Sequence, residues 1–177
     1  MTKSRKLSIL KGMILTLAVL LAGCSYSVVG GNPPLPKGAE SLGLYPVQNQ
    51  TFVPDLEIRL NAQLKEMFRG NTSMRLVPPA RAELRLSITL KELKNQTSGL
   101  GILQEAGGVN YALKGAVELE ERLTGATLLQ EENLSVELTE SRNEALNYTN
   151  QDPTSSSLIE LTALFARRVY ERIFVEF

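Results

Sequence analysis

The chain has 177 residues, with 19 lysines and arginines and 19 aspartates and glutamates, so its formal net charge is zero. It contains no histidine and only one cysteine, which excludes His-based catalytic triads, an intramolecular disulfide and the commonest metal ligand. Hydrolases that use carboxylates alone remain an open alternative. We nevertheless expect a protein that is not an enzyme and that has no cofactor and no metal site.

Residues 1–23 have the composition of a lipoprotein signal peptide. Four basic residues precede an apolar run of nine residues at 13–21, which is much shorter than the roughly 20 residues of a membrane-spanning helix. The run ends in Leu21-Ala22-Gly23-Cys24, a lipobox. We predict cleavage before Cys24, attachment of diacylglycerol to its thiol, and a further acyl chain such as palmitate on the freed amine. An ordinary secretory leader is the alternative.

Residues 24–38 form the lipidated N-terminus and a tether, and residues 39–177 form one predicted domain. The leader removes four basic and no acidic residues, so the mature chain has a net charge of −4, which argues against a nucleic-acid partner. Ser25, rather than aspartate, follows the cysteine and favours the outer membrane. Three glycines and three prolines in residues 25–38 resist regular structure, and the tether spans at most about 50 Å.

The first half of the domain predicts a short strand, a helix and a second short strand. The first strand is predicted over Ser41–Val47, followed by a polar turn at residues 49–51. Pro54 suits the first position of a helix that ends at Gly70-Asn71. Its apolar stripe consists of Leu56, Leu60, Leu64, Met67 and Phe68. Met74–Val77 is the second candidate strand.

The second half predicts longer strands and a closing helix. Strict alternation of apolar and polar residues over 82–91 indicates a strand with one buried face. Residues 93–108 lose the alternation and contain four glycines, so we predict a loop there. A hairpin that turns at Thr124-Gly125 follows, and Thr154 or Ser155 is the predicted cap of the last helix. Its apolar face consists of Leu158, Leu161, Phe165, Val169 and Ile173.

This order of elements predicts an α+β two-layer sandwich. Two amphipathic helices would pack on one face of a roughly four-stranded, mostly antiparallel sheet, and the other face would be open. The candidate ligand contacts on that open face are basic: Arg85, Lys91, Lys94 and Lys114. They could bind an anionic ligand such as a phosphorylated sugar. The alternative is a solvated face on which Glu83, Glu118 and Glu120 neutralise the same charges.

The mature chain resembles the LptE family, the lipoprotein subunit of the lipopolysaccharide-assembly machine. The resemblance extends from the lipidated cysteine to the C-terminus, although many members have glycine where this chain has Ser25. The matching segments are Cys24-Ser25-Tyr26, Leu35–Gly38, Ser41–Leu64, Leu123-Thr124-Gly125 and Arg172-Ile173-Phe174.

The resemblance implies a sandwich of two helices and four strands, anchored at the periplasmic face of the outer membrane. It further implies that the domain plugs the lumen of an LptD-like β-barrel and supports the assembly of that barrel. The domain would also contact lipopolysaccharide during its insertion into the outer leaflet.

Two other roles remain open. A lipoprotein can activate a peptidoglycan synthase or form part of a secretion pore, but an activator that crosses the periplasm needs a longer linker than the about 14 residues present here. A ligand-binding module of the periplasm is favoured if the open face of the sheet forms a closed pocket.

Overall fold

The computed structural model describes residues 32–98, 108–141, 153 and 155–175, so the predicted leader, Cys24 and Thr154 lie outside the described residues. The chain makes a short 3-10 turn at Pro36–Gly38 before the first strand. The elements that follow are β1 (Ser41–Leu44), β2 (Gln48–Asn49), α2 (Leu56–Gly70), β3 (Arg75–Val77), β4 (Leu84–Ser98), β5 (Gly108–Glu121), β6 (Thr127–Ser141) and α3 (Ser155–Val175).

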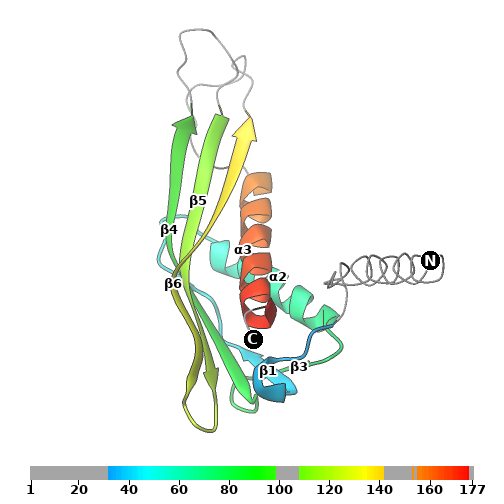
Figure 1. Cartoon of the computed structure of the whole chain (residues 1–177). Helices are drawn as coiled ribbons and strands as arrows, with labels where there is room; N and C mark the ends of the chain where they lie inside the picture. The colour runs from blue at the N-terminus through cyan, green and yellow to red at the C-terminus, as the bar shows by residue number, and fades with distance from the viewer. Residues whose placement is uncertain (1–31, 99–107, 142–152, 154, 176–177) are drawn as a thin grey trace, which may run out of the picture. The chain divides into compact units, whose positions relative to one another are not determined.

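The six strands form one mixed sheet with α2 and α3 on the same face (Figure 1). The strand order is β3-β1-β4-β5-β6, and β2 pairs with β4 beyond the end of β1. Strands β4, β5 and β6 are antiparallel neighbours, whereas β1 pairs in parallel with β3 and β4, and β2 in parallel with β4. The predicted α+β class is therefore confirmed, although the sheet has six strands and a parallel half.

The core lies between the sheet and the two helices. Every second residue of β4 from Leu84 to Leu90 is buried, as the alternation predicts. The predicted apolar stripes of the helices are also confirmed, with Met67 and Leu158 only partly buried. At their C-terminal ends the helices meet through the rings of Phe68, Tyr170 and Phe174, whose centroids lie 4.4–6.4 Å apart. Aromatic pairs at these distances add to the stability that burial provides.

The predicted loop over residues 93–108 is wrong at both of its ends. Strand β4 continues to Ser98 and β5 begins at Gly108, while residues 99–107 lie outside the described residues. The alternation fails because β4 contains a β-bulge: Leu90 pairs with Gly115 and Glu92 with Lys114, which leaves Lys91 as the extra residue. One extra residue transfers all later side chains to the opposite face, so Leu93 packs against the core where residue 92 would be expected.

The connection from β2 to α2 differs in detail from the prediction. The helix begins at Leu56, two residues after Pro54, and the residue between them, Asp55, has a φ angle of 65°. This left-handed conformation is uncommon for a residue with a side chain, although aspartate tolerates it better than most. The Asp55 side chain makes no capping hydrogen bond. Glu57 places a negative charge in the first turn of α2, which the helix dipole favours.

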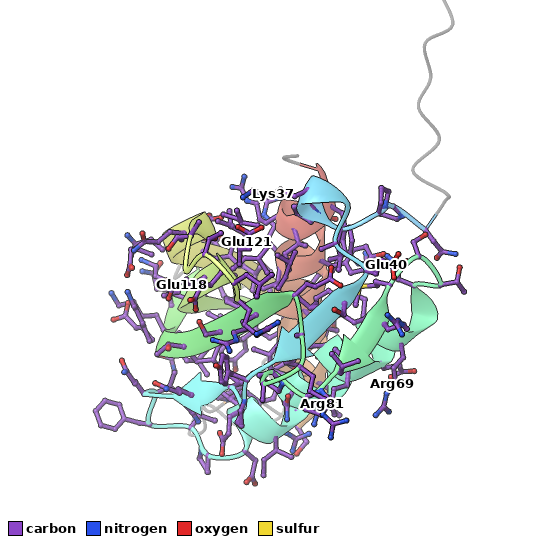
Figure 2. All side chains as sticks on the ribbon, turned by 90° about the horizontal axis from the view of Figure 1, so that it is seen from below. Lys37, Glu40, Arg69, Arg81, Glu118 and Glu121 are labelled. Carbon is purple, nitrogen blue, oxygen red and sulfur yellow. The ribbon has the colours of Figure 1, made fainter. Side chains whose placement is uncertain are left out.

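The last residues of the predicted tether contact the domain. Leu35 is buried in the core, and Lys37 Nζ lies 3.2 Å from a carboxylate oxygen of Glu121 at the end of β5 (Figure 2). Hydrogen bonds from Thr124 and Lys37 hold the pKa of Glu121 below its ordinary value. The chain is therefore fixed to the domain before β1 begins.

Neither α2 nor α3, the helices of the described residues, is both long and apolar enough to cross a membrane.

Candidate functional site on the open face of the sheet

The face of the sheet opposite the helices is polar along β4, β5 and β6. On β4 it consists of Arg85, Ser87 and Thr89 before the bulge, and of Glu92, Lys94 and Gln96 after it. On β5 it consists of the even-numbered residues from Asn110 to Glu120, of which Ala112 and Ala116 are apolar. Figure 2 shows Glu118 on this side, away from α3. Any ligand contact on the sheet must come from this polar surface.

All four predicted cations lie on the open face, but they do not form one cluster. Arg85 donates a hydrogen bond from Nε to the backbone oxygen of Pro79, at 3.2 Å. Lys94 lies nine residues further along β4, which corresponds to about 30 Å at the usual rise of a strand. The structure therefore brings Lys91, Lys94 and Lys114 into one region and leaves Arg85 apart.

The three clustered lysines have acidic neighbours. Lys94 Nζ lies 3.0 Å from Glu92 Oε1, and Lys114 stands directly opposite Glu92 in the β4–β5 register. Lys91 pairs with Glu132 of β6 at 2.5 Å. The charges of Lys91 and Lys94 are therefore already paired, but by Glu132 and Glu92 and not by the glutamates that the solvated-face alternative named. Lys114 has no ion-pair partner within 4.0 Å among the described residues.

The two strands that flank Ala116 of β5, β4 and β6, each contain a β-bulge near it. One is Lys91 in β4. The other is in β6, where Gly115 pairs with Leu134 but Val117 pairs with Glu131, so two β6 residues stand opposite Ala116 alone. Bulges increase the local twist of a strand and redirect side chains, and they are frequent next to functional sites. Here they lie in β4 and β6, the two neighbours of β5, close to the small side chain of Ala116.

The result is an open pocket of about 280 Å³ above Ala116. Its wall on β4 carries the hydroxyls of Ser87 and Thr89, and its wall on the β2 side is Gln50. Glu118, which stands opposite Ser87 in the sheet, closes a further side. The remaining lining residues are Lys91, Ala116, Val117 and Glu132.

The Lys91–Glu132 pair forms the rim of this pocket. Lys91 Nζ donates both to Glu132 Oε2 and to the backbone oxygen of Glu132, at 2.5 and 3.1 Å, and Gln130 donates to Glu132 Oε1. Hydrogen bonds from Lys91 and then Gln130 hold the pKa of Glu132 below its ordinary value. Both side chains are more than one-third exposed, at 38% and 57%. The pair therefore contributes little stability and mainly fixes the position of the two groups.

Core packing on the other side of the sheet fixes the strand at the same place. A Cβ atom on Gly115 would lie 2.9 Å from Cζ of Phe165 in α3 and 2.8 Å from the backbone oxygen of Thr89. Only glycine lets the helix and the neighbouring strand approach this closely. The pocket thus stands directly behind the contact between β5 and α3.

The charges of the pocket determine which ligands it suits. Lys91 contributes one positive charge, and Glu118 and Glu132 contribute two negative charges, so the pocket is net acidic. A phosphate would therefore be repelled unless it displaced Glu132 from Lys91. Two hydroxyls, an amide and a carboxylate instead suit a neutral or cationic ligand rich in hydroxyl groups.

The sequence predicts only Lys91 of these residues as a ligand contact, and Glu118 only as a neutralising charge. The signal that points to the rest is the odd spacing of core residues along the strands, which marks the bulges. Among the described residues, no three acidic or cysteine side chains are placed to hold a metal ion.

Comparison with known proteins gives structural neighbours only. No family model and no curated protein sequence matches this chain. The rare lipoprotein B of Shewanella oneidensis has 15% identity and a TM-score of 0.48, and the alignment covers 77% of this chain and 96% of that one. Several of the structural neighbours are bacterial lipoproteins.

Two further structural neighbours are also bacterial lipoproteins. A minor lipoprotein of Acinetobacter baumannii has 15% identity and a TM-score of 0.47, with 78% of this chain and 92% of that one covered. A lipoprotein of Neisseria meningitidis has 12% identity and a TM-score of 0.42, with 75% and 99% covered.

Proposed function

We propose that this chain is an outer-membrane lipoprotein of the LptE type, a subunit of the lipopolysaccharide-assembly machine. It would be anchored at the periplasmic face through lipid on Cys24. In this role it plugs an LptD-like β-barrel, supports the assembly of that barrel and contacts lipopolysaccharide on its way to the outer leaflet. The observation that carries the proposal is the combination of a lipobox with the α+β sandwich that the sequence resemblance implies.

The position of the domain's first residues supports a role close to the membrane. Asn32 is held by side-chain hydrogen bonds to Thr72 and Ser73, so only seven residues, 25–31, separate Cys24 from the domain. Seven residues extend at most about 25 Å. A domain on so short a tether stays beside its own membrane, where a barrel subunit is found. A peptidoglycan-synthase activator would have to reach much further into the periplasm.

The chemistry of the chain supports a binding role. The whole sequence lacks histidine, and its one cysteine is the proposed lipid attachment site. The open-face pocket carries hydroxyl, amide and carboxylate groups that suit the sugar portion of a lipopolysaccharide. Among the four predicted cations, Lys114 is the one best placed to meet a phosphate, since Lys91 and Lys94 are paired with glutamates.

The test is affinity purification of the tagged full-length chain after mild detergent extraction, followed by mass spectrometry. We expect a large outer-membrane β-barrel in stoichiometric amount. Depletion of the chain should also lower the amount of that barrel in its folded, heat-modifiable form on semi-native gels. Recovery of a peptidoglycan synthase or a secretion-pore component without a barrel would overturn the proposal and favour the alternative role.

A further inference from the structure

The turn between β2 and α2 presents an aromatic side chain to solvent. Phe52 has a relative exposure of 105%, so its side chain is fully exposed to solvent. Ile58, in the first turn of α2, is also 63% exposed. Single exposed apolar residues are common, but phenylalanine is enriched at protein–protein interfaces relative to the rest of the surface.

Hydrogen bonds hold this turn rigidly. Asn49 Oδ1 accepts hydrogen bonds from the backbone N–H and the hydroxyl of Thr51, at 3.0 and 2.7 Å. Its Nδ2 donates to the backbone oxygen of Val53 at 2.9 Å and to Glu57 at 2.7 Å. The residues on both sides of Phe52 are therefore fixed, and Val53 packs against the core. An aromatic side chain on a fixed backbone loses less conformational freedom when it binds than one on a flexible loop, which favours an interface hot spot.

The charges around the turn favour a protein partner over a lipid surface. Between residues 48 and 58 the only charged side chains are Asp55 and Glu57, and both are acidic. Segments that bind membranes carry lysine or arginine, because the lipid surface is negatively charged. With Arg59 one residue further, the charges next to this apolar tip along the chain are still net negative, which fits an apolar pocket bordered by basic side chains or backbone N–H groups.

The position of the turn also favours a protein partner over a lipid surface. Asn32, where the described chain begins, is bonded to Thr72 and Ser73 just beyond the C-terminal end of α2. Phe52 precedes the N-terminal end of that helix, whose 15 residues measure about 22 Å. The lipid tether therefore joins the domain at one end of α2, and the exposed aromatic stands at the other end.

We propose that the Phe52 turn is the anchor by which this domain docks into an apolar, basic-rimmed pocket of its protein partner. The inference rests on the proposed function for the identity of that partner, the β-barrel. The rest of the inference depends only on the turn itself.

The experiment compares three variants of the full-length chain with the wild type in the same detergent purification. Phe52→Ala removes the ring, and Asn49→Ala keeps the ring but removes the side chain that fixes the turn. Leu123→Ala is the matched control, because Leu123 is another large exposed apolar residue, at 76%, in the turn between β5 and β6. We expect the first two variants to weaken retention of the barrel by about tenfold or more, as hot-spot truncations do, and Leu123→Ala to leave it unchanged.

A photo-crosslinking amino acid at position 52, with position 123 as control, separates the possible failures. A discrete protein adduct at position 52 that is absent at position 123 supports docking to a protein. If the wild type retains the barrel but Phe52→Ala retains it equally well, the inference is overturned and the proposed function stands. If no barrel is recovered, the proposed function fails, and the crosslinked adduct at position 52 alone tests whether the turn docks to a protein. A lipid adduct, or none, overturns the inference. An unchanged melting temperature of Phe52→Ala excludes misfolding as the cause of any loss.

Discussion

Replacement of Asn71 by alanine should weaken the attachment of the tether to the domain. Asn71 is 3% exposed and follows the last residue of α2. Its Nδ2 donates to the backbone oxygen of Pro33 at 3.1 Å and to the Tyr170 hydroxyl at 3.0 Å, and its Oδ1 accepts from the backbone N–H of Ser73 at 2.9 Å. One side chain thus connects the first described residues, the end of α2 and the helix α3.

The expected loss in the free energy of unfolding follows from these three hydrogen bonds. Each intramolecular hydrogen bond contributes about 0.5–1.5 kcal/mol, so Asn71→Ala should lower the free energy of unfolding by roughly 2–4 kcal/mol. Tyr170→Phe removes only one of the three and should cost about 1 kcal/mol. Because the two residues share that bond, the double mutant should be less destabilised than the sum of the single mutants by about 1 kcal/mol.

The assay is equilibrium urea unfolding of the chain from residue 25 onward, and Asn61→Ala is the matched control. Asn61 lies within α2, the helix that Asn71 follows, but its Oδ1 is buried without a hydrogen-bond partner in the described part of the chain. Alanine is a better helix former than asparagine by about 0.5 kcal/mol, so Asn61→Ala should leave the stability unchanged or slightly raised. Equal losses for the two substitutions would refute the reasoning.

Four further predictions concern the site and the anchor. Gly115→Ala should destabilise the domain by about 1–3 kcal/mol in the same assay, because its Cβ would meet Phe165 and the Thr89 carbonyl; full stability would contradict the close packing. The folded-state pKa of Glu132 is lowered, so the stability from its pair with Lys91 is present above the unfolded pKa and lost as pH falls through the folded one. Lys91→Met should therefore raise the Glu132 titration midpoint measured by carboxyl NMR, and an unmoved midpoint would count against the pair. Lys91→Gln combined with Lys114→Glu should weaken lipopolysaccharide binding about tenfold, as expected for charged hydrogen bonds, and unchanged binding would return both lysines to the solvated face. Cys24→Ala should accumulate as an unprocessed precursor that a fatty-acid probe does not label; labelling of that variant would disprove the anchor.

Local periodicity predicts the parts of this fold that are long and regular. The stripe of α2, the face of α3 and the alternation of β4 up to Leu90 all match the structure, because each element repeats its pattern over at least seven residues. Strands β2 and β3 have only two and three residues, too few for an alternating pattern. Their parallel pairing depends on where α2 returns the chain, which no local pattern encodes.

The bulges left a signal in the sequence that strict alternation does not capture. Core residues Leu90 and Leu93 are three positions apart, and Leu129 and Leu134, which also face the core, are five apart. Residues on one face of a regular strand are separated by even numbers, so an odd spacing requires an extra residue. An interpretation that allowed such shifts would have extended β4 past the bulge. It would also have indicated where β4 and β6 bend.

The pocket could not be predicted, because it depends on how three strands align. Its lining residues come from β4, β5 and β6 and from Gln50 after β2, which lie up to 82 positions apart in the chain. The prediction from single strands identified basic residues on the open face but not their partners. Glu132 stands beside Lys91 only because the β6 bulge shifts the β5–β6 register, and this pairing changes Lys91 from a free cation to the rim of an acidic pocket.

The two faces of the sheet are coupled at residues 115 and 116. Gly115 leaves the space that Phe165 of α3 occupies on the core side, and Ala116 leaves the space of the pocket on the open side. The backbone of Thr89 contacts the first position, while its side chain lines the pocket. A larger residue at 115 must therefore move either the helix or a wall of the pocket. Interiors packed to this density transmit such displacements rather than absorb them. The shape of this pocket consequently depends on a packing contact between β5 and α3 on the other face of the sheet.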